Sequence, residues 1–73
     1  MTAKEIATAT VEAAKMFVGE PTMPDTELAN SIVVVFDGST FSVADNGEGD
    51  DDLTFDEAVV VVTKDIEQMS SVD

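Results

Sequence analysis

The sequence has 73 residues, of which 16 are acidic and three are lysine or arginine, and its formal net charge is -13. It contains no cysteine, which excludes disulfides and thiolate metal sites, and no histidine, which removes the commonest general base. This length predicts one small domain over residues 1–73. No apolar run approaches the roughly 20 residues that span a bilayer, and no secretion signal is recognisable at the N-terminus. We therefore expect a cytoplasmic protein without a membrane partner.

The first predicted element is an amphipathic helix that starts after Thr2. Thr2 and Glu5 have the spacing of a capping box, in which each side chain accepts the backbone N–H of the other residue. At about 100° per residue, the apolar side chains of residues 6–18 fall on one arc and the charged ones on the other. Gly19 fits the left-handed position that ends helices, and Pro21 prevents the helix from resuming.

Residues 19–30 are predicted to form a connector. Asp25 or Thr26 could cap a short helical turn through Leu28 and Ala29.

A β-hairpin follows the connector. The β-branched run 31–36 predicts a strand, Asp37-Gly38 predicts a tight turn, and residues 39–44 predict the return strand. The alternation of side chains in a strand separates two faces. Ile32, Val34, Phe36, Phe41 and Val43 should face the helices, whereas Val33, Val35, Thr40 and Ser42 should face away.

The last predicted element is a second helix. Thr54 and Glu57 form another capping box, which favours a helix start. The four valines at 59–62 would suit a strand. In a helix, however, Val59 and Val62 fall on the same face as Phe55 and Ile66. We expect a helix, with Val60 and Val61 at the border of its buried side.

These elements predict an α+β fold in the order helix, strand, strand, helix, with an antiparallel hairpin packed on two amphipathic helices. Two helices can cover only one face of a hairpin, so they leave Val33, Val35 and the strand edges uncovered. A third strand from the connector, or edge pairing between two copies into a homodimer, would resolve this.

The most acidic stretch, 45–52, carries five carboxylates and no cation, and is expected to be a solvated loop because unpaired charge is costly to bury. Residues 19–52 hold nine acids and no base, whereas residues 1–18 are neutral overall. Such a charge distribution repels nucleic acid and attracts basic protein surfaces. The candidate partner-binding residues are Asp37, Asp45, Glu48, Asp50, Asp51, Asp52, Asp56 and Glu57.

An alternative hypothesis is calcium binding. Residues 46–57 resemble a twelve-residue EF-hand loop with oxygen ligands at several of its positions, although Asp51 stands where that loop needs glycine. The ligands would include Glu48, Asp50, Thr54 and Glu57. Our first interpretation assigns no metal and no other cofactor.

Catalysis is not expected. The acids lie in a glycine-rich stretch that is expected to be exposed to solvent, and Ser39, Thr40 and Ser42 have no candidate base.

In size, acidity and helix-hairpin layout the chain resembles the small acidic DNA mimics that phages encode, the anti-restriction and anti-CRISPR proteins. The resemblance rests on no residue motif. It implies a non-enzymatic viral inhibitor that occupies the basic DNA- or RNA-binding surface of a complex in the host cytoplasm. Two other interpretations remain open. The acidity could reflect a high-salt habitat, or the protein could be a structural or assembly subunit that buries Val33, Val35, Val60 and Val61.

Overall fold

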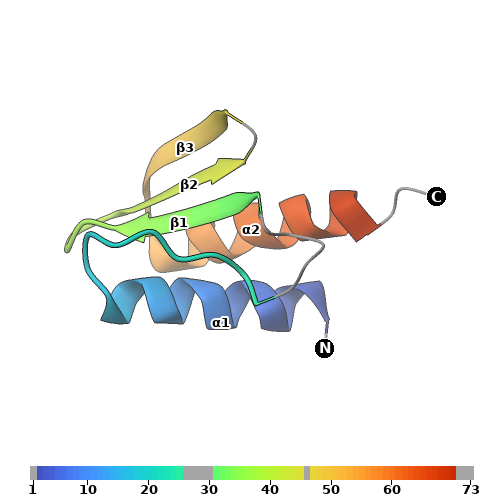
Figure 1. The fold of residues 1–73 in the computed structure, drawn as a ribbon, viewed down its shortest axis with the longest axis horizontal. Helices are drawn as coiled ribbons and strands as arrows, with labels where there is room; N and C mark the ends of the chain where they lie inside the picture. Colours follow the sequence, from blue (N-terminus) through green and yellow to red (C-terminus); the bar gives the residue numbers. More distant parts are fainter. Residues whose placement is uncertain (1, 26–30, 46, 71–73) are drawn as a thin grey trace.

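The computed structural model describes residues 2–25, 31–45 and 47–70, and places a helix, three strands and a helix in that order (Figure 1). The strands form one antiparallel sheet in the order β1-β2-β3. The predicted α+β class is confirmed, and the structure adds a third strand to the predicted hairpin. No helix within the described residues has the length and apolar character needed to cross a membrane.

Helix α1 (Ala3–Met16) begins at the predicted capping box. The Thr2 N–H donates to Glu5 Oε1 at 2.9 Å, and the Glu5 N–H donates to Thr2 Oγ1 at 3.2 Å. The helix ends at Met16, and Gly19 follows in the left-handed region with φ 82°. The buried side of α1 consists of Ala7, Thr10, Val11 and Ala14. These small side chains allow close packing against the rest of the fold.

The connector after α1 runs along the outer edge of β1 (Ile32–Phe36). The Gly19 N–H donates to the Phe36 carbonyl at 2.7 Å, and Thr22 and Val34 exchange two backbone hydrogen bonds of 2.8 Å. Within its described part, residues 19–25, the connector therefore pairs with the sheet at the Thr22–Val34 bridge. The helical turn predicted through Leu28 and Ala29 lies outside the described residues.

Strands β1 and β2 (Phe41–Asp45) form the predicted hairpin. Their register pairs Val34 with Val43 and Phe36 with Phe41, which places these side chains on one face. Ile32, Val34, Phe41 and Val43 are buried on that face, as predicted. Phe36 is partly buried, and its ring stacks on Phe41 with centroids 4.4 Å apart.

The expectation of an acidic loop over 45–52 was wrong, because most of that stretch is strand β3 (Glu48–Leu53). β3 pairs with β2 through Val43–Asp50 and Phe41–Leu53, with a bulge between these pairs. Every residue of β3 except Leu53 is exposed. The strand exists because its backbone groups find partners on β2, which requires no burial of its side chains.

Helix α2 (Phe55–Ser70) confirms the helical interpretation of the second capping box. The Thr54 N–H donates to Glu57 Oε1 at 2.9 Å, and the Glu57 N–H donates to Thr54 Oγ1 at 3.2 Å. Val62 is fully buried, whereas Val60 is 50% exposed. The valine run therefore crosses from the core to the surface, as the helical periodicity predicts.

Both helices lie on the same side of the sheet (Figure 1), and the hydrophobic core lies between the helices and the sheet. α1 packs beside β1, and α2 packs beside β2 and against α1. β3 therefore extends the sheet at the end nearest α2.

Candidate functional site

Two adjoining hollows lie between β3 and α2, with volumes of about 510 and about 390 Å³. Asp50 and Val61 line both of them, and we call the pair the β3–α2 groove. The larger hollow is lined by Val43, Asp45, Glu48, Gly49, Asp50, Val61, Asp65 and Gln68. The smaller hollow is lined by Asp50, Leu53, Asp56, Glu57, Val60 and Val61.

The strand register explains how the acids of the sheet reach the groove. Asp45 pairs with Glu48, and Val43 pairs with Asp50, so these side chains share the face that looks toward the helices. At the other wall, Glu57 and Asp65 lie four residues before and after Val61, which places all three on one side of α2. The acidic side chains of β2 and β3 and those of α2 therefore line the same space.

Six carboxylates of the described residues line this space, from β2, β3 and α2: Asp45, Glu48, Asp50, Asp56, Glu57 and Asp65. Their proximity has an electrostatic consequence at Asp65. Burial raises the pKa of the Asp65 carboxyl above its ordinary value, and the charges of Asp45, Asp50 and Glu48 raise it further. Asp45 also accepts a hydrogen bond from the Ser31 hydroxyl at 3.0 Å. The groove is therefore a region of concentrated negative potential.

Lysines do not line the groove, and all three are placed elsewhere on the described surface. Lys4 and Lys64 line a separate hollow to which Val60 also contributes. Lys15 Nζ lies 6.0 Å from the centre of the Phe55 ring. The described lining of the groove therefore carries acids without a lysine, whereas Lys4 and Lys64 share their hollow with Glu67.

The structure brings five of the eight candidate partner-binding residues into the groove: Asp45, Glu48, Asp50, Asp56 and Glu57. Asp51 and Asp52 are exposed on β3 and do not line it. Asp37 lies in the β1–β2 turn, where its Oδ1 accepts the N–H groups of Ser39 and Thr40 at 2.8 Å each. These hydrogen bonds lower the pKa of Asp37, which has a structural role in the turn.

Sequence reasoning missed Asp65 and the apolar floor of the groove. The four-residue spacing of Glu57, Val61 and Asp65 was a signal that could have placed Asp65 beside the other acids. The contribution of Leu53 and Val60 could not be anticipated, because it depends on how β3 lies beside α2.

The residues of the calcium hypothesis are arranged differently from a coordinating loop. Glu48 and Asp50 belong to a strand, and Thr54 and Glu57 bond each other in the capping box. Within residues 2–25, 31–45 and 47–70, no group of three or more acidic side chains is placed to hold a metal ion. The geometry therefore offers the calcium hypothesis no support.

The residues of the assembly hypothesis occupy two separate places. Val60 and Val61 line the groove, whereas Val33 and Val35 are partly buried and pair with Ala44 and Ser42 on the face away from the helices. The four valines do not form one continuous surface.

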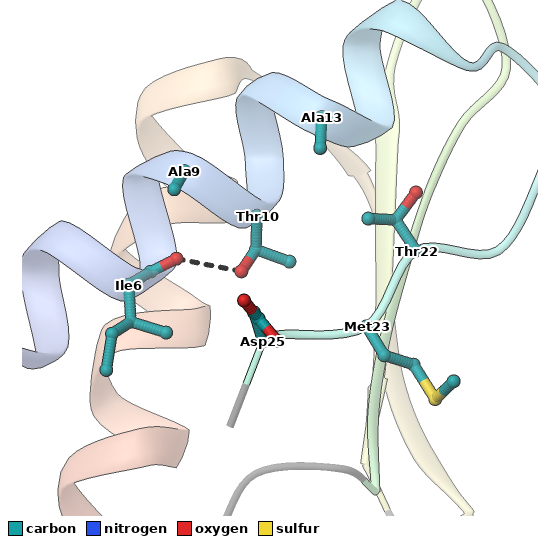
Figure 2. A pocket seen from close by; sticks show the side chains of 7 residues that line it. All are labelled: Ile6, Ala9, Thr10, Ala13, Thr22, Met23 and Asp25. Carbon is teal, nitrogen blue, oxygen red and sulfur yellow. Dashed lines mark hydrogen bonds between the residues drawn. The ribbon is translucent and has the colours of Figure 1, made fainter. Parts of the chain in front are cut away.

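A separate hollow of about 210 Å³, distinct from the groove, lies between α1 and the connector (Figure 2). Thr10 and Asp25 point toward one another across it, and the Thr10 hydroxyl donates to the Ile6 carbonyl at 2.7 Å. Its other walls are Ile6, Ala9, Ala13, Thr22 and Met23. Among the described residues only Asp25 contributes a carboxylate to this hollow, which gives it a different chemistry from the groove.

Comparison of the chain with models of protein families, with curated proteins and with solved structures found no match. The fold and site together define a small α+β domain with an acidic groove between β3 and α2.

Proposed function

We propose that this protein is a non-enzymatic inhibitor that captures a basic, nucleic-acid-binding surface of another protein with the β3–α2 groove. The observation that carries the proposal is the convergence of six carboxylates from three elements on a space that no lysine lines. Soluble proteins usually intersperse both signs of charge over their surfaces. A one-signed, hollowed region is better suited to a partner of opposite sign.

The mechanism is electrostatic competition with nucleic acid. Duplex DNA presents about one negative charge per 1.7 Å of axis, and its binding proteins present lysine and arginine to match. Carboxylates held on β3 and α2 offer the same sign of charge on a pre-organised scaffold, as an anti-restriction or anti-CRISPR protein does. The association is fast and weakens with salt, because exposed charges are screened over about 8 Å at physiological ionic strength.

Two matched triple variants test this proposal. Glu48→Gln, Asp50→Asn and Glu57→Gln remove three charges from the groove, and the glutamine at 57 can still serve the capping box. Glu12→Gln, Glu20→Gln and Asp25→Asn remove three charges from exposed positions outside the groove. Each immobilised protein is incubated with nuclease-treated cell extract, and bound proteins are identified by mass spectrometry at about 50 mM and about 300 mM salt.

We expect the wild type and the control triple to retain nucleic-acid-binding proteins at low salt, and the groove triple to lose them. Added duplex DNA should displace the captured proteins in proportion to its concentration. Equal capture by both triples, or captured proteins that DNA does not displace, would contradict the proposal.

A further inference from the structure

The smaller hollow of the groove combines an apolar floor with an acidic rim. Its floor is formed by Leu53 and Val61, which are partly buried, and by Val60, which is 50% exposed. Its rim is formed by Asp50 from β3 and by Asp56 and Glu57 from the first turn of α2. Apolar side chains that remain accessible to water beside three carboxylates are not explained by charge display alone, and Val60 among them also borders the hollow of Lys4 and Lys64.

The two parts of this hollow require different things from an occupant. A compact cation would satisfy the carboxylates but leave the valines in contact with water. An apolar side chain would cover the valines but remove water from the carboxylates without replacing it, which is costly. Lysine and arginine satisfy both parts, because their aliphatic stems lie on apolar surface while their charged heads remain at its rim.

A second copy of this chain is a poor occupant. Each copy carries a net charge of -13, and docking one groove against another would bring their acidic rims together. The charge complementarity instead favours an exposed basic segment of a different protein.

We propose that the smaller hollow is a docking site for a long cationic side chain of the partner. Its aliphatic stem lies on Leu53, Val60 and Val61, and its charged head lies among Asp50, Asp56 and Glu57. This inference rests on the proposed function and adds to it the chemistry that the groove recognises. A partner surface rich in lysine or arginine is preferred to a surface with equal charge on shorter side chains.

A series of peptides of equal charge tests the role of the stem. Decapeptides carry four cationic residues, which are lysine, ornithine or 2,4-diaminobutyrate, so that the stem shortens by one methylene at each step. Binding is measured by isothermal calorimetry at low salt and about pH 6, where the amines are protonated and most carboxylates ionised. We expect the affinity to fall by about two- to fourfold for each methylene removed.

A matched pair of variants assigns the effect to the floor of the hollow. Val60→Thr preserves the shape of the side chain but adds a hydroxyl to the floor, and Val33→Thr makes the same change on the other face of the sheet. Val60→Thr should weaken the lysine peptide by about two- to threefold and reduce the difference between the peptides. Val33→Thr should change neither.

The outcomes separate this inference from the proposed function. Equal affinities of the three peptides for the wild type would overturn the inference, while loss of binding in the groove triple would still support electrostatic capture. Unchanged binding in the groove triple would overturn both. If Val60→Thr did not fold, the peptide series on the wild type would decide the matter alone.

Discussion

The two outer strands of the sheet, β1 and β3, are held in place by different forces. β1 is an apolar strand whose Ile32 and Val34 are fully buried in the core. β3 consists of acids and a glycine before Leu53, and almost all of its residues are exposed. Burial therefore stabilises β1, whereas β3 depends on backbone pairing with β2 and on the turn that precedes it. Because the side chains of β3 are not needed in the core, they are available to contact a partner.

The free edges of these strands are also protected in different ways. The connector covers part of the β1 edge through Gly19 and Thr22. On β3, protection comes from charge, from the bulge before Leu53 and from Asp52 at φ 58°. Charges and bulges hinder edge-to-edge pairing with other sheets. The same carboxylates repel other copies of this chain and, in the proposed function, attract a basic partner.

One row across the sheet should show the largest difference between the two strands. Val34, Val43 and Asp50 lie side by side in the register, but Val34 is fully buried and Asp50 is exposed. We expect Val34→Ala to lower the free energy of unfolding by about 1–3 kcal/mol. We expect Asp50→Ala to change it by about 0.5 kcal/mol or less, in the stabilising direction, because it relieves repulsion. Urea denaturation at neutral pH measures both, and equal losses would refute the distinction between the strands.

The same difference explains how much of the fold could be predicted from the sequence. Both helices have a capping box and an apolar face, and the first hairpin has a β-branched run followed by Asp-Gly, so these elements could be predicted. β3 was missed because glutamate, glycine and aspartate have low strand propensity and show no apolar alternation. Asn46-Gly47 was a hairpin signal in the sequence, but the surrounding charge suggested a loop.

The candidate site was predictable in composition and not in shape. The acids of 45–57 could be picked out because uncompensated carboxylates are conspicuous in a sequence. Their division between the groove and the open surface depends on the β2–β3 register and its bulge, which place Asp50 in the groove and leave Asp51 outside its lining. The apolar floor arises only when Leu53 and Val60, from different elements, meet.

The backbone of the β2–β3 hairpin should give the second largest effect. Gly47 has φ 86° and Asp52 has φ 58°, both in the left-handed region that favours glycine. We expect Gly47→Ala to lower the free energy of unfolding by about 1 kcal/mol and Asp52→Gly to raise it by about 0.5 kcal/mol.

Asp51→Gly is the matched control for Asp52→Gly, because Asp51 is also an exposed acid of β3 but does not have a positive φ. Glycine there should lower the free energy of unfolding by about 0.5–1 kcal/mol through added freedom of the unfolded chain. If both glycine variants lowered stability equally, the left-handed backbone at Asp52 would not be the cause.

The smallest expected effect comes from Asp65, where the acids of β2 and β3 act on α2. Its pKa is raised in the folded state, so its ionised form destabilises the fold. This penalty is complete at pH values above the folded-state pKa and disappears as the pH falls toward the ordinary value of 3.8.

We therefore expect Asp65→Asn to raise the free energy of unfolding at neutral pH by about 0.5 kcal/mol or less, because solvent still screens a carboxylate that is only partly buried. The gain should shrink as the pH approaches 4 and as salt is added. Urea denaturation over a pH series measures it, with Asp25→Asn as the control at an exposed position outside the groove. An equal gain in both variants would mean that total charge matters and the groove does not. A gain confined to Asp65 would show that the acids of β2 and β3 repel a carboxylate on α2 while the protein is folded. The proposed binding of a cationic side chain in the groove requires such a repulsion, because the cation would relieve it.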